Sequence, residues 1–571
     1  MIDQFIILRV NAETKEVKTE PLSGSELLSA GRGFIANTLL NEVETSCDPL
    51  GPQNKLIFAT GIMPDSRISG SSRLSVGAKS PLTFGIKEAN SGGQAALALA
   101  RLGIRAIIME GAGDPGNILV ISRERCRIED GREFLGLGNY ALVEGLFERY
   151  GTKKCIISIG IAGEYGLPIA GIAVTDREGY PGRFAARGGL GAVMGSKGIK
   201  AIVIDMSSEV GTFGDSPEFR AARKRYVAAI KNTPLTGEAL PKYGTNFIYG
   251  PLSALGAVPV KNFSLGSFER GQKIDGEALH RTIASRGGKG QSSHSCSTGC
   301  VVRCSNVYVD EEGSIVVSPI EYETIALLGA NLGIDSLDEI AKLNYICNDL
   351  GVDTIEVGGG IGVAMEEGYY SFGDFKAIEA ILGEIKKGSI LGRVFGQGTY
   401  GAGKILGARR IPAVKRQGMP GYDPRGIKGI GVTMASSPMG ADHTAGHTFA
   451  ADVNHQARDG QVEISRSAQI RRAMYDSLGW CIFHEAPTID DLGLISDLIE
   501  CVYGKDLSPE QMLSIGARTL SREIEFNRAA GITLQDDRLP KFFSEERLAN
   551  FGTIYDLSDE ELERTLVDLE N

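Results

Sequence analysis

The sequence contains no long apolar run. None of its uninterrupted apolar segments approaches the ~18 residues that a membrane-spanning helix requires. The first ten residues, MIDQFIILRV, lack both the basic and the long apolar regions of a secretory signal, and nine unevenly spaced cysteines do not resemble a disulfide framework. We therefore expect a reduced, cytoplasmic protein without a membrane span.

Basic clusters are also absent. The formal net charge is −11, and no long stretch of the chain is rich in lysine and arginine, so nucleic acid is not an expected partner. The chain has no P-loop pattern and no H-E-x-x-H motif, and residues 357–366, VGGGIGVAME, fit a dinucleotide loop poorly. We therefore expect neither a P-loop nucleotide site, nor a zinc-protease site, nor bound NAD or FAD.

Three closely spaced cysteines are the most distinctive feature that is present. Cys296, Cys300 and Cys304 follow one another with C-x3-C-x3-C spacing, ahead of a predicted hairpin whose turn contains Gly313. Thiolates select iron–sulfur clusters, zinc or copper(I), and zinc knots favour C-x2-C pairs, which this chain lacks. The spacing favours a cluster with a distant fourth ligand over structural zinc or buried apolar cysteines.

Glycine is abundant, with 75 residues, and clusters in short motifs between apolar runs. The first of two glycine-rich loops precedes a predicted helix over residues 93–102. Free N–H groups at a helix start bind anions, and two cations lie in the same loop. The candidate ligands are Arg73, Lys79, Asn90, Ser91 and Gly92. An ordinary N-cap formed by Asn90 or Ser91 is the alternative interpretation.

A second glycine-rich loop follows at residues 187–191. Arg187, Gly188 and Gly189 begin it, and Lys197 lies further along. Successive glycines beside cations are typical of a backbone cradle for an anion.

Two similar hexads end predicted helices in distant parts of the chain. They read NDLGVD, from Asn348 to Asp353, and DSLGWC, from Asp476 to Cys481. Gly351 and Gly479 stand where a left-handed helix stop is expected. Paired hexads predict two equivalent binding events, and two ordinary glycine caps are the alternative.

Candidate acid–base residues occur in two segments. Glu321 and Glu323 open a predicted apolar helix after the hairpin. His443 and His447 lie in a glycine-rich segment, residues 419–455, where a histidine is a candidate proton donor. For His455, in the same segment, we expect a ring satisfied by backbone hydrogen bonds.

The order of predicted elements indicates an α+β fold. Residues 1–207 form a β-rich domain with the two glycine loops. Residues 208–405 form a helical domain with the cysteine loop and the first hexad, and residues 406–571 form a second helical domain with His443 and Cys481.

Taken together, these motifs resemble the tungstopterin-dependent aldehyde:ferredoxin oxidoreductase family, over nearly the whole chain. The segments that carry the resemblance are DPLGPQNKLIFATG, RGGLGAVMGSKGIKAI, PIEYETIALLGANLGID, CNDLGVDTIEVG, DPRGIKGIGVT, SSPMGADHT and DSLGWC. Members hold tungsten between two pterins that are linked through magnesium, next to one [4Fe–4S] cluster. The resemblance does not distinguish tungsten from molybdenum, because pterin sulfurs coordinate the metal.

The resemblance also implies ligands. Cys481 would be the fourth cluster ligand, and Asp353 and Asp476 would accept hydrogen bonds from the pterin rings. The remaining residues implied at the pterins and their phosphates are Arg73, Lys79, Asn90, Ser91, Gly92, Arg187, Gly188, Gly189, Asn348 and Gly479.

The implied reaction is oxidation of an aldehyde to a carboxylic acid. Glu321, preferred over Glu323, would activate water or orient the substrate, and His443 would donate to the carbonyl oxygen. Electrons would leave through the cluster to ferredoxin or a small iron–sulfur subunit, from a homodimer or a larger complex.

Two departures from the family pattern leave alternatives open. The usual cysteine loop is C-x2-C-x3-C, so a tungsten-dependent aromatic acyl-CoA reductase of the benzoyl-CoA type is the alternative function. The chain has no histidine between His294 and His443, so a metal bridging two subunits is not expected. A non-catalytic iron–sulfur or zinc module is the third interpretation.

Overall fold

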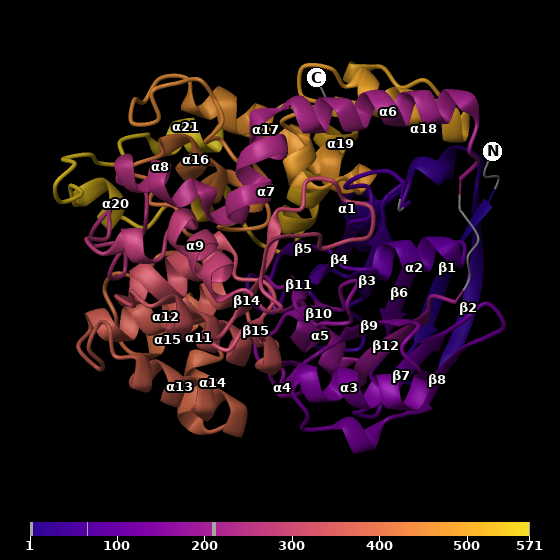
Figure 1. Ribbon diagram of the computed structural model, residues 1–571, viewed down its shortest axis with the longest axis horizontal. Coiled ribbons are helices and arrows are strands. Elements are labelled where there is room, and N and C mark those ends of the chain that lie inside the picture. The colour runs from indigo at the N-terminus through magenta and orange to yellow at the C-terminus, as the bar shows by residue number, and fades with distance from the viewer. Residues whose placement is uncertain (1–3, 66, 208–212, 570–571) are drawn as a thin grey trace.

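The computed structural model describes residues 4–65, 67–207 and 213–569. Two six-stranded sheets occupy the N-terminal part, and most of the remaining chain is helical (Figure 1). The α+β fold class is thereby confirmed. Within the described ranges, no helix combines the length and apolarity needed to cross a membrane.

The two sheets have the same topology. Their strand orders are β2-β1-β6-β3-β4-β5 and β8-β7-β12-β9-β10-β11. Strand β1 pairs in parallel with β6, and β7 pairs in parallel with β12. The other strand pairs of the two sheets are antiparallel. The N-terminal part is therefore one structural unit built twice.

The strands of the first sheet are β1 (Gln4–Asn11), β2 (Glu16–Ser23), β3 (Leu56–Thr60), β4 (Leu74–Lys79), β5 (Ile86–Ser91) and β6 (Ile104–Glu110). Those of the second are β7 (Asn117–Ile121), β8 (Cys126–Asp130), β9 (Lys154–Ser158), β10 (Ile172–Val174), β11 (Arg183–Ala185) and β12 (Ile199–Asp205). Strands β1 and β2 form an antiparallel hairpin, and the central strands β3, β6, β9 and β12 are apolar and largely buried.

The helices of the repeated unit also correspond. Helices α1 (Gly31–Glu42) and α3 (Asn139–Tyr150) precede β3 and β9, and α2 (Ala95–Arg101) and α5 (Leu190–Ser196) precede β6 and β12. A short extra helix, α4 (Ile161–Glu164), occurs only in the second unit. Apolar residues of both sheets, including Phe58 and Ile157, share one core with α2 and α5.

The cysteine loop connects β13 (Gln291–His294) to β14 (Ser305–Val309), and these strands form a small sheet with β15 (Ile315–Val317). Gly313 has a φ of 75°, as predicted for the turn. The helix predicted after it is irregular: α10 (Tyr322–Thr324) continues as a π-helical turn, Ile325–Gly329, and a 3₁₀ turn, Ala330–Leu332.

The other helices of the middle segment are α6 (Pro217–Asn232), α7 (Leu240–Tyr243), α8 (Tyr249–Ala254), α9 (Gly276–Arg286), α11 (Leu337–Leu350), α12 (Thr354–Glu366), α13 (Phe375–Lys387), α14 (Ile390–Phe395) and α15 (Gly398–Ile405). Ser216 caps α6 by accepting from Phe219 N, with Pro217 at the first helical position. Residues 357–366 lie inside α12, so they form no dinucleotide loop.

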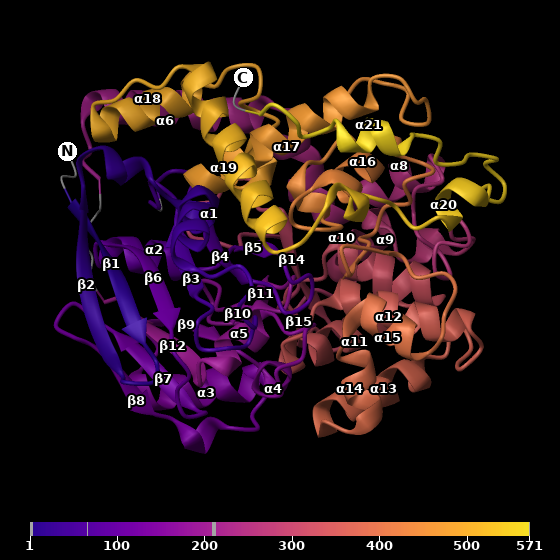
Figure 2. The same cartoon turned by 180° about the vertical axis from the view of Figure 1, so that it is seen from behind.

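The C-terminal segment contains a two-strand ribbon, β16 (Ala413–Val414) and β17 (Gln417–Gly418), and helices α16 (Lys428–Ser436), α17 (Gln461–Leu478), α18 (Gly493–Tyr503), α19 (Pro509–Ala529), α20 (Phe542–Glu545) and α21 (Asp559–Glu563). Helix α17 packs against α19 and α1, and α6 lies along α18 (Figure 2). The C-terminal helices thus cover the first repeat.

The two hexads occupy corresponding places on the repeated unit. Gly351 and Gly479 adopt the left-handed conformation, with φ of 73° and 83°. Gly171 N donates to Gly351 O at 2.9 Å, and Arg73 N donates to Gly479 O at 3.2 Å. Each hexad is therefore both a helix stop and a docking point on one copy of the repeat.

Glycine is required where the hexads dock. Gly61 follows β3 and Gly160 follows β9. A Cβ at these positions would lie 2.4 Å from Leu478 O and 2.2 Å from Leu350 O. Such contacts are shorter than van der Waals contact, so the backbones could not approach as they do.

We predict that Gly61→Ala and Gly160→Ala each lower the free energy of unfolding by about 1–3 kcal/mol, because overpacking forces the backbones apart. Thermal unfolding measures this. Gly250→Ala in α8 is the matched control, since no atom lies within 4 Å of its added Cβ. Equal midpoints for all three variants would contradict the docking account.

Candidate active site

Four thiols face one cavity. Cys296, Cys300 and Cys304 line it together with Cys481, from the end of the second hexad, and with Arg73. Burial is the main cause that raises the pKa of Cys300, Cys304 and Cys481 above the ordinary thiol range. A bound cation would be needed to hold these thiols as thiolates.

The donor chemistry of this cavity fits a metal cluster. His484 also lines it, but its Nε2 lies 3.0 Å from Ser69 Oγ. Four convergent thiols match the ligand set of a [4Fe–4S] cluster and equally that of structural zinc. The geometry thus brings Cys481 to the cysteine loop, as the resemblance implied.

The first glycine loop borders the same cavity. Arg73 donates to the side-chain and backbone oxygens of Asn90. A Cβ on Gly92 would lie 3.1 Å from both Arg73 Nη1 and Cys296 Sγ. Helix α2 starts after Gln94, which forms no side-chain cap, and Ser91 Oγ donates to Gly92 O. The N-cap interpretation of Asn90 and Ser91 is therefore wrong.

Lys79 is not part of this group. Its Nζ donates to Thr45 O and Cys47 O, both at 2.6 Å, and the residue is buried. Lys79 is the last residue of β4, whereas Arg73 precedes its first residue, so this ammonium binds backbone carbonyls at the opposite end of the strand.

The second glycine loop meets the first hexad. Gly188 and Gly189 have φ of 80° and 75°. The buried Arg187 side chain donates to Asp353 at 3.1 Å and Glu356 at 3.2 Å, and it also donates to the Gly418 carbonyl at 2.6 Å. Burial raises the pKa of Asp353, and Arg187 opposes that rise. The loop and hexad are thus joined through one ion-paired arginine.

The second hexad meets α1 in a similar way. Arg32 Nη1 lies 3.4 Å from Asp476 Oδ2, and the same guanidinium pairs with Glu523 at 2.8 Å. Burial raises the pKa of Asp476. Asn348, at the corresponding position of the first hexad, instead approaches Tyr140 OH at 3.5 Å, so the two hexads are not chemically identical.

The two candidate glutamates face different neighbours. Glu323 Oε1 lies 3.6 Å from His443 Nε2, and its other oxygen accepts from Gly421 N at 2.7 Å. Glu321 accepts from Thr245 Oγ1 at 2.5 Å and lies 3.9 Å from Arg183. Burial raises the pKa of Glu321. The geometry therefore pairs His443 with Glu323, although the sequence analysis preferred Glu321.

Aromatic rings surround His443. Tyr422 stacks on it with ring centroids 5.9 Å apart, and Tyr422 also contacts His447 at 5.0 Å. Burial lowers the pKa of His447 to about 3, so this imidazole is neutral at physiological pH. The His455 ring stacks on Phe449 with centroids 5.9 Å apart, and its Nδ1 is buried without a hydrogen-bond partner among the described residues, so the expected backbone hydrogen bonds at that atom are not found.

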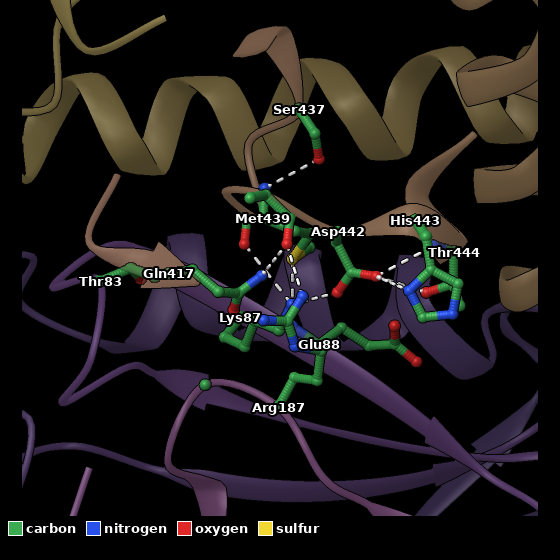
Figure 3. A network of polar contacts seen from close by, with 12 residues as sticks. Thr83, Lys87, Glu88, Arg187, Gln417, Ser437, Met439, Asp442, His443 and Thr444 are labelled. Carbon is green, nitrogen blue, oxygen red and sulfur yellow. Dashed lines mark hydrogen bonds and ion pairs between the residues drawn. The ribbon is translucent and has the colours of Figure 1, made fainter. Parts of the chain in front are cut away.

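A buried ion pair holds the loop that carries His443 (Figure 3). Lys87 Nζ donates to Asp442 Oδ2 at 2.6 Å, and Asp442 Oδ1 accepts from Thr444 N at 3.0 Å. Arg187 and Gln417 both donate to Ala441 O, one residue earlier. Burial opposes ionisation of Asp442, yet Lys87 and Arg187 hold its pKa well below the ordinary value.

Two family models together match most of the chain. The model described as "Aldehyde ferredoxin oxidoreductase, N-terminal domain" matches residues 7–206, and that described as "Aldehyde ferredoxin oxidoreductase, domains 2 & 3" matches residues 221–566. The chain belongs to the aldehyde ferredoxin oxidoreductase family.

Curated relatives agree with this assignment. The chain is 33% identical to the tungsten-containing aldehyde ferredoxin oxidoreductases of Pyrococcus furiosus and Thermococcus kodakarensis, over 94% of this chain and 91% of each relative. It is 26% identical to the aliphatic sulfonate oxidoreductase, WOR-like subunit, of Pyrococcus furiosus, over 90% of this chain and 84% of that one.

A solved structure supports the fold. The complex titled "Active site complex BamBC of Benzoyl Coenzyme A reductase in complex with 1,5 Dienoyl-CoA" aligns with a TM-score of 0.79, covering 99% of this chain and 94% of that chain. The sequences are 18% identical, so this likeness concerns the fold alone.

Several buried charged residues of the site were not among the candidates predicted from the sequence. The clearest are Arg32, Lys87, Glu356 and Asp442. Lys87 is the only one with a local signal, because it and Glu88 form a charged pair inside a short strand-like segment. The partners of all four are distant in sequence, so spacing alone could not identify them.

We predict that Lys87→Met destabilises the protein by about 3–5 kcal/mol, because it leaves Asp442 with one cation fewer in a buried site. Thermal unfolding measures the loss. The matched control is Lys18→Met, which removes an exposed pair with Glu16 and should cost about 0–1 kcal/mol. Similar losses in both variants would contradict a special role for the Lys87 pair.

Proposed function

We propose that this family member oxidises an aldehyde to a carboxylic acid at a tungsten bis-pterin centre. The electrons leave through a [4Fe–4S] cluster to ferredoxin or a small iron–sulfur subunit. The observation that carries the proposal is the convergence of four thiols at the end of the second hexad, next to Arg73 of the first glycine loop.

The residues that would hold the cofactors come from both repeats and from the segments that follow them. Cys296, Cys300, Cys304 and Cys481 would bind the cluster. The pterins and the magnesium-linked phosphates would be held by Arg73, Asn90, Gly92, Arg187, Gly188, Asp353 and Asp476. When bound, the tungsten centre supplies Lewis acidity and two-electron chemistry that no side chain offers. Molybdenum is the alternative metal.

Buried polar atoms without partners support ligand binding here. Within the described residues, Glu88 Oε1, Glu323 Oε1, His443 Nδ1 and Gln94 Nε2 are buried and accept or donate no hydrogen bond. Buried polar groups are normally paired, so these atoms indicate that the site is completed by bound groups.

We assign the acid–base roles to Glu323 and His443. His443 donates a hydrogen bond to the aldehyde oxygen, and the free oxygen of Glu323 orients water and accepts its proton. The aldehyde and one water yield the acid, two electrons and two protons. The charge of Arg73 lowers the pKa of Glu321, and the charge of Glu321 raises the pKa of Cys304. We therefore assign Glu321 to the cluster side of the site.

The cysteine loop also reaches the surface. Thr298, Gly299 and Arg303, which lie between the cluster ligands, are exposed. A protein acceptor docking on this loop would lie close to the cluster. We place ferredoxin, or the small iron–sulfur subunit of a larger complex, against this face of each subunit.

An acyl-CoA reductase of the benzoyl-CoA type is the second candidate. The C-x3-C-x3-C spacing, which departs from the usual family loop, is the observation that favours it. Copurification with several iron–sulfur or flavin subunits would support this alternative.

We predict that tungsten-loaded protein, assayed anaerobically with a viologen acceptor, oxidises members of an aldehyde panel. Glu323→Gln and His443→Asn should each lower turnover by about 10²–10⁴-fold, because general acid–base catalysis is lost. Tungsten content should stay at the wild-type level.

Glu321→Gln is the matched comparison, since it neutralises the other glutamate of the same segment. Its effect on turnover should be smaller than that of Glu323→Gln. Normal turnover in Glu323→Gln would remove that residue from the mechanism. Absence of aldehyde oxidation by tungsten-loaded wild type, together with reduction of an aromatic acyl-CoA, would favour the second candidate.

A further inference from the structure

Helix α17 contains a buried arginine that the proposed function does not use. Arg472 is 1% exposed, and its Nη2 donates to Glu485 Oε2 at 2.5 Å. Its Nε and Nη1 are also buried, and neither has a hydrogen-bond partner among the described residues. Leaving the donors of a buried charged group unpaired is costly, so they indicate an acceptor supplied by a ligand.

The position of Arg472 on α17 indicates which ligand supplies the missing acceptor. It precedes Asp476 by one helical turn, and side chains at i and i+4 share one face of a helix. Both residues are buried on α17, and Asp476 is the first residue of the second hexad. The free donors therefore lie near the second hexad.

We propose that Arg472 is a cofactor-anchoring residue. Arg472 donates a hydrogen bond to the carbonyl oxygen of a pterin ring. Asp476 accepts hydrogen bonds from the N–H groups of the same ring. The inference rests on the proposed function for the presence of a pterin.

A carboxylate and a guanidinium together match the polar edge of the ring. The pyrimidinone edge of a pterin presents N–H donors next to a carbonyl acceptor. A carboxylate has acceptors only, so Asp476 can satisfy the donors but not the carbonyl. A guanidinium has donors only. Arg472, one helical turn from Asp476, can therefore donate to the carbonyl that the carboxylate cannot pair. Its charge also favours an anionic pterin with phosphate and thiolate groups.

The first hexad lacks this device. Asn344 stands one turn before Asn348, as Arg472 stands one turn before Asp476. Its amide already donates to Pro319 O at 2.6 Å. The arginine next to Asp353 of the first hexad is Arg187, which comes from the second glycine loop, so the second hexad alone has an arginine on the helix that it ends.

The test compares Arg472→Met with Arg471→Met. Arg471 is the matched control, because it shares Glu485 as partner but directs its other donor to Ser467 Oγ at 2.5 Å. Pterin, measured by fluorescence after oxidative extraction, and tungsten are determined per chain. Thermal midpoints are measured for protein produced with and without tungstate and pterin synthesis.

We expect Arg472→Met to retain pterin about tenfold more weakly, as for loss of a charged hydrogen bond. Its cofactor-free midpoint should be unchanged or higher, because two unpaired buried donors are removed. Arg472→Lys should recover part of the retention, and Arg471→Met should match wild type.

Two results would overturn the inference. A lower cofactor-free midpoint with wild-type pterin per folded chain would make Arg472 a structural residue. Wild-type pterin with a raised KM only for negatively charged aldehydes would make it a substrate anchor. Wild-type protein that holds pterin but oxidises no aldehyde would refute the proposed function alone, since pterin retention still tests Arg472.

Discussion

The backbones of Gly61 and Gly479 lie in contact, and no side chain fits between them. The corresponding contact in the second repeat joins Gly160 to the first hexad. These two contacts bring the ends of α11 and α17 onto the sheets, and they determine where Asp353, Asp476 and Cys481 lie. The rest of the site depends on this docking, because its ligands come from segments that are distant in sequence.

Buried charges form a second layer around the docking points. Arg32, Lys87 and Arg187 each hold an acidic partner from a helical segment. Burying an ion pair costs desolvation energy that the mutual attraction scarcely offsets, so such pairs are poor stabilisers but good positioning devices. Here they fix the positions of the hexads and the His443 loop relative to the glycine loops. The site is thereby preformed for a cofactor with many polar groups.

Much of the fold could be predicted from local sequence patterns. The strands β3, β6, β9 and β12 coincide with apolar runs of the sequence, and glycine identified both helix stops. The choice between Glu321 and Glu323 could not be made in the same way. Glu321 is the extended residue before α10, whereas Glu323 lies in its first turn, so their side chains diverge and only Glu323 reaches His443.

The remaining misses have a common physical cause. Lys79 lies close to the first glycine loop in sequence, but it ends strand β4 and its ammonium reaches residues 45–47. Lys87 and Arg472 are charged residues whose burial results from packing between the N-terminal and C-terminal parts. Local propensity contains no information on such long-range burial, whereas the resemblance to the family did associate Cys481 with the cysteine loop.

The most direct test of this account is elemental analysis of anaerobically purified protein for tungsten, molybdenum, iron and zinc. The account predicts about one tungsten and about four irons per chain, the content of one pterin metal and one [4Fe–4S] cluster. Zinc without tungsten or molybdenum, after expression in a host that makes the pterin, would contradict it and make the four thiols a structural zinc site.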